Sequence, residues 1–420
     1  MSRDADVLVV GGGPAGAVTA AYLARAGHDV VLLERSAAYR WRAGGVFASS
    51  AAVRELGHAG LDGDTLGRVA RPIPAMRVEL PDAARTTFRL TYGAETTNEP
   101  AVGFDRSGLD PALLAHAVAC GVEVLTGVEA TDVWLPDHAH AAEVVARRAE
   151  PDPGPGGAID TDLAFRPRVV VGADGPRSIV AEAAGMVRAP VLDGRVALSW
   201  HVADEPGDPE REARMVVLPG AAYCGLAPVP GGRMNVGIVL AGRAWRERLK
   251  AEGAARVGQA VLDAIPQVDG DPEAWRTGAI TDAIAGASPL GSRVERRAGP
   301  GWLVVGDAAG FLDPFTGEGL HRALVSARLA AEVIDADLRG RAPAGGLAAY
   351  DRAMRERFAA KDVVSRVVQG FLARPALFAY AGRRLARRDD VRATMGLVMG
   401  DLVPASRALD PRFLAALLRP

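Results

Sequence analysis

Near its start the chain carries a run of residues, Gly11 to Gly16, with the spacing G-x-G-x-x-G that suits a pyrophosphate group. Gly11 permits a tight turn, Gly13 lets the backbone approach a phosphate, and Gly16 lets a helix pack against a strand. Glu34 ends the next apolar run, where a carboxylate can accept hydrogen bonds from both hydroxyls of an adenosine ribose. A ribose 2′-phosphate would meet a like charge there. The pattern therefore predicts a dinucleotide site that disfavours NADP.

Two further motifs place an aspartate where a strand is expected to end. The run Gly306-Asp-Ala-Ala-Gly310, with Asp313-Pro-Phe-Thr-Gly-Glu-Gly319 behind it, carries Asp307. An aspartate at this place can bind the ribityl hydroxyls of a flavin. The helix expected to begin near Gly317 can stabilise the negative charge of the reduced ring. The other motif is Gly172-Ala-Asp174-Gly-Pro-Arg-Ser178.

Short apolar runs bounded by glycine predict the elements that position these motifs. Val7–Val10 and Val30–Leu33 are expected to be buried strands, and 15–26 between them a helix that Gly27 ends. Together they form a βαβ unit. A further helix is expected at 111–120, with Asp110 as its N-cap.

The second half of the chain changes its pattern after about residue 186. Four short, partly alternating segments predict an antiparallel sheet: 196–202, 214–218, 223–229 and 233–240. The run 302–305 returns to the pattern of a buried strand, and the chain is expected to be mostly helical from about Gly317 onward. The stretch 151–157, rich in proline and glycine, predicts a turn.

In this order the three motifs resemble those of the single-domain FAD oxidoreductases typified by para-hydroxybenzoate hydroxylase and geranylgeranyl reductase. The resemblance covers roughly residues 5 to 340. It implies a tightly held FAD at the first motif. It also implies NAD(P)H as a transient reductant that has no Rossmann domain of its own. The chain contains no second G-x-G-x-x-G, which agrees with this.

The expected fold is α/β. A Rossmann-type FAD-binding domain (1–72, 101–185 and 286–340) is interrupted by an antiparallel β-sheet substrate domain (73–100 and 186–285). C-terminal helices form the remaining region, 341–420.

The resemblance also assigns cofactor-binding residues. Arg42 lies in a loop, Arg40-Trp-Arg-Ala-Gly-Gly-Val46, that contacts the flavin in the hydroxylases, and Arg106 matches an arginine near the cofactor. A surface ion pair is the alternative for both arginines. The full set expected to bind the cofactor is Gly11, Gly13, Pro14, Ala15, Gly16, Glu34, Arg35, Arg42, Arg106, Asp174, Asp307, Pro314, Gly317, Gly319 and Leu320.

No catalytic side chain and no metal ligand is assigned from the sequence. His201, Tyr223 and Asn235 lie on the sheet expected to cover the flavin, and a structural role is the alternative for each. His321 could line the flavin edge or pack inside its helix.

Two reactions fit the motifs. Thr316-Gly-Glu-Gly319 is more similar to geranylgeranyl reductases, whereas the loop at Arg42 is more similar to hydroxylases. The reductase motif Tyr-x-Trp-x-Phe-Pro is matched at Tyr223 to Pro228, but Gly225 and Ala227 replace its two aromatics and widen the pocket. We expect a flavin monooxygenase that acts with O2, through a C4a-hydroperoxyflavin, on a lipophilic or polycyclic intermediate of secondary metabolism. Reduction of C=C bonds is the alternative.

Two other classes fit less well. Flavin halogenases need a Trp-x-Trp pair, which is absent, and a lysine at the pocket, where neither Lys250 nor Lys361 is expected. A binding protein without flavin chemistry would leave Glu34, Asp174 and Asp307 without a ligand.

Composition limits the partners. A net charge of −2 argues against nucleic acid. The two cysteines, Cys120 and Cys224, exclude a disulfide framework and a structural zinc site. The start of the chain is unlike a signal peptide, and the apolar run 7–24 is broken by glycines, so we expect a cytoplasmic protein without a transmembrane segment.

Four arginines, Arg383, Arg384, Arg387 and Arg388, are expected on a solvated helix face; peripheral membrane contact or a landing site for the NADPH phosphate is the alternative.

Overall fold

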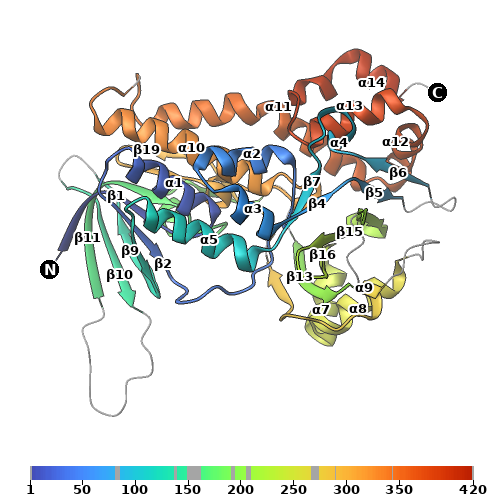
Figure 1. Ribbon diagram of the computed structural model, residues 1–420, viewed down its shortest axis with the longest axis horizontal. Helices are drawn as coiled ribbons and strands as arrows, with labels where there is room; N and C mark the ends of the chain where they lie inside the picture. Colours follow the sequence, from blue (N-terminus) through green and yellow to red (C-terminus); the bar gives the residue numbers. More distant parts are fainter. Residues whose placement is uncertain are drawn as a thin grey trace, which may run out of the picture.

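The computed structural model describes residues 2–80, 86–136, 140–148, 162–190, 194–204, 210–265, 274–288, 290–342 and 344–418. The turn expected at 151–157 lies outside these residues. The structure has the expected α/β architecture, with two large sheets and a group of helices at the C-terminal end (Figure 1).

The first sheet has eight strands, with β19-β20-β11-β1-β2-β8 along its main path and β10 and β9 added beside β11. Strands β20, β11, β1, β2 and β8 pair in parallel, so their carboxyl ends lie along one edge. Their bounds are β1 Ser2–Val10, β2 Val30–Glu34, β8 Glu123–Thr126, β9 Val128–Trp134, β10 Glu143–Arg148, β11 Asp162–Gly172, β19 Ala298–Gly299 and β20 Trp302–Val304.

Three helices pack together over this sheet: α1 (Pro14–Arg25), α5 (Arg106–Ala119) and α10 (Gly319–Leu338). Figure 1 shows α10 and α1 in the upper part of this layer and α5 lower, with β1, β11, β9 and β10 at the left. Helix α1 is alanine-rich: Ala20 and Ala21 are buried in the core with the strands of the sheet, and Ala17 is buried among the neighbouring helices. Small side chains there allow a close approach of helix, sheet and α10.

The second sheet has seven strands in the order β17-β13-β16-β15-β14-β5-β6. Along β13, Leu198, Trp200 and Val202 pack into a core with α8, whereas Ala197 belongs to the core on the opposite face. Figure 1 shows α7, α8 and α9 below this sheet. The bounds are β5 Met76–Glu79, β6 Thr87–Leu90, β13 Arg195–Ala203, β14 Ala213–Leu218, β15 Ala222–Val229, β16 Arg233–Ala241, α7 Arg243–Glu252, α8 Ala254–Ala264, α9 Ala274–Thr277 and β17 Ala285–Ala287.

A small three-stranded sheet, β3-β7-β4, contacts β15 of the second sheet. Its strands are β3 Phe47–Ala48, β4 Ala70–Ile73 and β7 Ala101–Phe104, and the short helices nearby are α2 Ser50–Ala59, α3 Gly63–Val69 and α4 Ala94–Thr97. The remaining short elements are α6 Ile179–Ala183, β12 Val187–Arg188, β18 Arg293–Val294 and the 3-10 turns η1 Pro219–Ala221, η2 Gly306–Ala309, η3 Pro314–Thr316 and η4 Ala405–Leu409.

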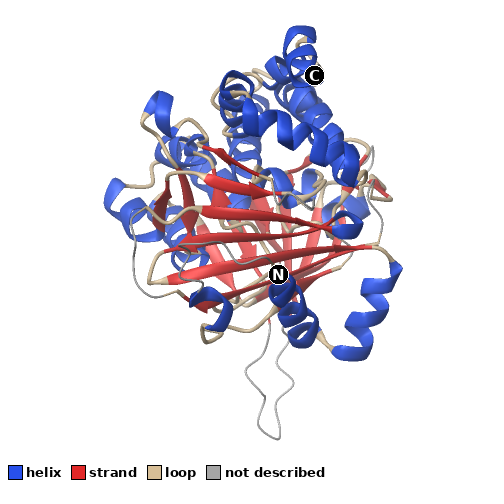
Figure 2. Cartoon of the chain, turned by 90° about the vertical axis from the view of Figure 1, so that its right-hand side faces the viewer, coloured by secondary structure: helices blue, strands red, loops and turns tan. Residues whose placement is uncertain are grey.

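The C-terminal region is helical, as expected: α11 Ala348–Leu372, α12 Pro375–Arg387, α13 Asp389–Met399 and α14 Pro411–Leu418. Helices α12 and α13 pack against β6, at one edge of the seven-stranded sheet, and Figure 2 shows the C-terminal helices above the strands. Leu385 and Val398 belong to the same core as Tyr223 of β15. The division of the chain into the three parts given above stays a prediction.

The expected strands are present, and most of their ends lie within one or two residues of the expected ones. The helix expected at 111–120 begins earlier, at Arg106. Its N-cap is Asp105, whose side chain accepts from Ser107 N, and Asp110 pairs with Arg106 instead of capping. The prediction of Asp110 as N-cap was therefore wrong.

Candidate functional site

The three motifs meet at the carboxyl ends of β1, β11 and β20. A Cβ on Gly11 would lie 2.5 Å from Ala173 O, so the first and third motifs touch. A Cβ on Gly306 would lie 2.8 Å from Ala15 Cβ, so the second motif abuts the start of α1. Ligands of open parallel sheets bind at this edge.

The start of α1 leaves an open place in front of its first turn. Gly13 is the N-cap, Pro14 occupies the first helical position, and no atom lies within 4 Å of the place that a Cβ on Gly13 would take. A Cβ on Gly16, in contrast, would lie 1.9 Å from Gly11 O. The first N–H groups of a helix have no partner within it, so this open place suits an anion.

Glu34 is buried at the end of β2 and holds this turn together. Its Oε2 accepts from Gly12 N at 2.9 Å, and its Oε1 accepts from Ser36 N at 2.9 Å and from Arg42 Nη2 at 3.0 Å. Burial opposes ionisation, but the two N–H groups and the Arg42 guanidinium prevail and lower the pKa of Glu34. The carboxylate is therefore charged at neutral pH and lies beside the glycine turn.

The two other motif aspartates differ in their surroundings. Asp174 Oδ2 accepts from Ile179 N at 2.7 Å, while its Oδ1 is buried without a hydrogen bond in the part of the chain that the structure describes. Asp307 is exposed, and no described residue donates to its carboxylate. The surrounding protein still raises the pKa of both carboxyls by desolvation. Both have acceptor oxygens free for a ligand.

The three arginines of the predicted set lie in different places. Arg35 is exposed and pairs with Glu129 at 3.8 Å, away from the glycine turn. Arg42 reaches Glu34, as above. Arg106 forms two hydrogen bonds with Asp110, at 2.6 and 2.8 Å, and donates to Gly45 O at 3.1 Å. Arg106 thereby ties the loop at 40–46 to α5.

The loop after η2 leads into α10. Gly317 has φ of +66°, and a Cβ there would also lie 2.8 Å from Phe47 Cδ1. Pro314 begins η3, and α10 begins at Gly319, close to the expected start. Leu320 is buried among the helices over the first sheet. The position of this loop is thus fixed by close packing.

A buried polar network that the sequence analysis missed joins this loop to the second sheet. Asp313 accepts from Arg195, from Tyr223 Oη at 2.6 Å and from Gln369 Nε2 at 2.8 Å. Arg195 also donates to Gln369 Oε1 at 2.7 Å. These residues come from β13, β15, α11 and the loop, so no short-range spacing could have found them.

The network gives Tyr223 a structural role that can be measured. In Tyr223→Phe, the buried Asp313 carboxylate loses a donor, and we expect the free energy of unfolding to fall by about 2 kcal/mol. Urea unfolding of the purified protein measures this. Tyr380→Phe is the matched control, because Tyr380 Oη donates only to Leu418 O, near the chain end, and a change of about 0.5 kcal/mol or less is expected. Equal losses in the two variants would contradict the role.

The structure corrects the expectation that neither lysine lies near the motifs. Lys361 of α11 is buried, 3.7 Å from Glu318 Oε2 in the motif before α10, and its Nζ donates to Asp401 Oδ1 at 2.9 Å. It also donates to Val398 O at 2.8 Å. His321 is buried beside the same aspartate, with Nδ1 at 3.1 Å, so it packs inside the helices.

The face of the second sheet toward the motifs has a floor of small residues. Gly225 and Gly237 are neighbours on β15 and β16, and Met215 of β14 flanks Gly225. Cβ atoms on the two glycines would meet nothing closer than 3.6 Å, and Met215 Cε is the nearest atom. Tyr223 shares this face and bonds Asp313 of the motif loop. We call this open strip over Gly225 and Gly237 the glycine floor.

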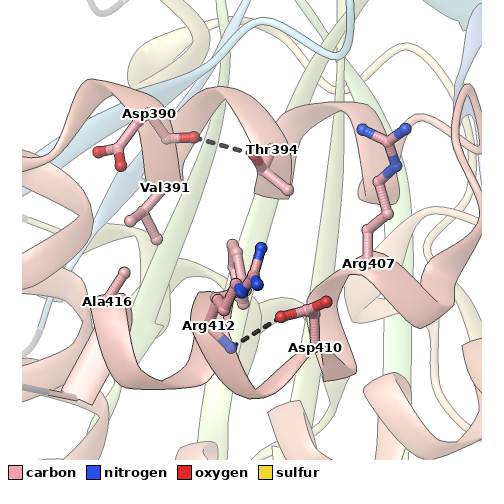
Figure 3. Close-up of a pocket in the computed structure, with 8 residues that line it drawn as sticks. Asp390, Val391, Thr394, Arg407, Asp410, Arg412 and Ala416 are labelled. Atoms are coloured by element: carbon pink, nitrogen blue, oxygen red, sulfur yellow. Dashed lines mark hydrogen bonds between the residues drawn. The ribbon is translucent and has the colours of Figure 1, made fainter.

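A separate hollow of about 410 Å³ lies in the C-terminal region (Figure 3). Its lining comes from α13, η4 and α14: Asp390, Val391, Thr394, Arg407, Asp410, Arg412, Phe413 and Ala416. Thr394 Oγ1 donates to Asp390 O, and Arg412 N donates to Asp410, so these contacts are local helix contacts. We assign it no function.

The four arginines at 383–388 do not form one free basic face. Arg388 forms hydrogen bonds with Asp390 at 2.8 and 3.1 Å, and Arg383 and Arg384 are half-buried. Arg387 is exposed. Within the described ranges, no helix has both the length and the apolar character needed to cross a membrane, and no group of His, Cys, Asp or Glu is arranged to hold a metal ion.

Comparison with known proteins shows the family to which the chain belongs. A model of the FAD binding domain family matches residues 4–367. The menaquinone reductase of Mycolicibacterium smegmatis is 27% identical over 422 residues, covering 96% of this chain and 93% of that protein. Digeranylgeranylglycerophospholipid reductase 1 of Methanopyrus kandleri is 31% identical over 339 residues, covering 78% of this chain and 80% of that protein.

A solved structure shows that the fold is shared as well. A probable FAD-dependent monooxygenase from Pseudomonas aeruginosa superimposes with a TM-score of 0.70 at 23% identity, covering 90% of this chain and 99% of that chain. The resemblance drawn from the three motifs is confirmed. The chain belongs to the FAD binding domain family, and it is an FAD-dependent oxidoreductase.

Proposed function

We propose that the enzyme reduces a C=C bond in a lipophilic, isoprenoid-bearing substrate, with NAD(P)H as the transient reductant of FAD. The observation that carries the proposal is the glycine floor, where Gly225 and Gly237 leave an uncharged strip that can take a flat or linear apolar group. The names of the two relatives, menaquinone reductase and digeranylgeranylglycerophospholipid reductase, support the same substrate class.

The proposed FAD site uses the residues assigned from the sequence. The open place before α1 takes the pyrophosphate, with Gly11, Gly13, Pro14, Ala15 and Gly16 around it. The ribose is bound by Glu34 and the loop that carries Arg42. The flavin end is bound by Asp307 and by the loop before α10, with Arg106, Asp174, Pro314, Gly317, Gly319 and Leu320 in supporting positions. Arg35, which points to Glu129, contributes least.

Bound FAD supplies a hydride when it is reduced, and the chain has three tasks. The α10 N-terminus favours negative charge on the reduced ring. The Arg195–Asp313–Tyr223 network fixes the motif loop against the second sheet. The apolar floor excludes water and orients the C=C bond, whose second carbon takes a proton that exchanges with solvent.

Monooxygenation of a lipophilic or polycyclic secondary metabolite is the second candidate. One observation favours it: the loop 40–46, similar to that of the hydroxylases, contacts both Glu34 and the second sheet, where Trp41 Nε1 donates to Ser199 O at 2.9 Å. A loop in this position can shield the flavin from water, which an oxygen-activating enzyme needs. We place either enzyme in the cytoplasm, with peripheral membrane contact where the substrate is a lipid.

Isotope labelling separates the two reactions. The purified flavoprotein, NADPH or NADH, and geranylgeraniol or menaquinol are incubated in D2O, once without oxygen and once under ¹⁸O2. Reduction adds two hydrogens to the substrate, at least one of them as solvent deuterium, and proceeds without oxygen. Incorporation of ¹⁸O, together with inactivity in the anaerobic sample, would contradict reduction and support monooxygenation.

A further inference from the structure

A polar cluster that the proposed reaction does not use lies beside the glycine floor. His201 of β13 is buried, with 2% of its surface exposed, and Asp282 holds it through two hydrogen bonds. Asp282 Oδ1 accepts from His201 N at 2.8 Å, and Oδ2 lies 2.5 Å from His201 Nδ1. This places the ring proton on Nδ1 and leaves a lone pair on Nε2.

His201 Nε2 and two other acceptors determine how the side-chain amide of Asn235 is oriented. Asn235 lies opposite His201 in the ladder of β13 and β16, and its Nδ2 is 3.4 Å from His201 Nε2. The same Nδ2 donates to Ser199 Oγ at 3.1 Å and to Trp200 O at 3.3 Å. Every neighbour of Nδ2 is an acceptor, so the nitrogen of the amide must point this way and Oδ1 must point the other way.

Asn235 Oδ1 points over the floor. It lies 3.8 Å from the place that a Cβ on Gly237 would take, and no residue in the described ranges donates to it. Ser199 lies opposite Gly237 on the adjoining strand, and its hydroxyl, which accepts from Asn235, keeps its own proton to donate. The floor is therefore edged by one fixed acceptor and one donor.

Trp41 closes the edge of this cluster. The centroid of its ring lies 4.4 Å from that of the His201 ring, and its Nε1 donates a hydrogen bond to Ser199 O. Trp41 has no atom within 4 Å of the Cβ position of Gly237, so it covers His201 and leaves the floor open. His201 thus contacts its neighbours and not the floor, which makes it a positioning residue.

We propose that Asn235 and Ser199, held by the His201–Asp282 pair, bind a hydroxyl group on the lipophilic substrate. A hydroxyl is both donor and acceptor, so it can donate to Asn235 Oδ1 and accept from Ser199 Oγ at once. An ether or a carbonyl can only accept, and either would leave Oδ1 unpaired in a closed site, which is costly. This inference rests on the proposed site and names the head group of its substrate: an alcohol or phenol.

The test is binding to the oxidised flavoprotein, which needs no turnover. The flavin absorbance is followed during titration with two matched pairs, geraniol against geranyl methyl ether and 1-naphthol against 1-methoxynaphthalene. We expect the alcohol or phenol of at least one pair to bind about tenfold more tightly than its ether. Equal affinities in both pairs, or no saturable binding of any probe, would overturn the inference.

Variants assign the preference to these residues. Asn235→Leu keeps the volume but removes the acceptor, so the preference for the hydroxyl should disappear while FAD content stays unchanged. Ser199→Ala, a smaller change that keeps the variant series informative if Asn235→Leu does not fold, should reduce the preference to about threefold. A full preference in both Asn235→Leu and Ser199→Ala would overturn the assignment.

The outcomes separate this inference from the proposed reaction. A hydroxyl preference that Asn235→Leu abolishes supports the inference even if isotope labelling contradicts C=C reduction. Confirmed reduction without any hydroxyl preference would overturn the inference and leave the reaction in place. Ligand affinity and product labelling are independent readouts.

Discussion

In Gly16→Ala, the FAD-free protein is expected to lose about 3 kcal/mol or more of its free energy of unfolding and to retain no FAD. The added Cβ would lie 1.9 Å from Gly11 O, a main-chain atom that cannot turn aside, and 3.0 Å from Ala173 Cβ. Relief requires α1 to move away from β1 and β11, where it is closely packed. Urea unfolding followed by circular dichroism measures the loss.

Gly13→Ala is the matched variant, because it adds the same methyl group to the same motif. Gly13 has φ of −69°, which alanine adopts without strain, and its Cβ would meet nothing within 4 Å. We expect unfolding of the FAD-free protein to change by about 0.5 kcal/mol or less. FAD affinity should fall by about 100-fold, because the methyl group takes the place proposed for the pyrophosphate. Unchanged FAD affinity would contradict that placement.

The elements around the glycine turn could be predicted from the sequence because their signals are local. The βαβ unit follows from apolar runs that glycines interrupt, and α1 and β2 end within one residue of the prediction because Gly27 and Glu34 mark those ends locally. The three motifs could be placed together because each follows a parallel strand, and parallel strands end at one edge. Local spacing therefore predicts the cofactor end of the molecule.

The start of α5 was predicted wrongly because a contact with a distant loop takes part in setting it. Asp110 before Pro111 suits an N-cap, but Asp105 caps the helix through Ser107 N, and Asp110 is used by Arg106 one turn earlier. Both aspartates are suitable N-caps by residue type, and the hydrogen bond from Arg106 to Gly45 O, in a distant loop, favours the longer helix that includes Arg106. Such a tertiary contact has no signature in the neighbouring sequence.

The buried polar groups could not be predicted for the same reason. Arg195 and Gln369 both bond Asp313, although 174 residues separate the first two. The sequence analysis placed His201 and Asn235 on the correct sheet, but Asp282, which fixes the ring, comes from a segment without a recognisable pattern. Residue type predicts that a buried charge needs a partner, and only the fold shows which partner it has.

The second large effect is expected at Lys361, whose removal takes a buried ammonium group away from two buried carboxylates. In Lys361→Met, Asp401 loses a partner at 2.9 Å and Glu318 loses one at 3.7 Å, while Val398 O at the end of α13 loses its donor. We expect the free energy of unfolding at pH 7 to fall by about 3–5 kcal/mol. The other lysine provides the control: Lys250 is exposed on α7, and Lys250→Met should change stability by about 0.5 kcal/mol or less.

The pH dependence distinguishes lost charge from lost packing. Burial raises the pKa of Asp401, but Lys361 and His321 outweigh it and hold that pKa at about 2. Because this lies below the unfolded value of about 3.9, the pair stabilises the native protein above pH 4, and this contribution is lost as the pH falls toward 2. Without Lys361, only His321 opposes the effect of burial, so the pKa of Asp401 rises and protonation of this carboxylate in mild acid reduces the loss of stability. The deficit of Lys361→Met should therefore be smaller at pH 4.5 than at pH 7, and an equal deficit at both would assign it to packing.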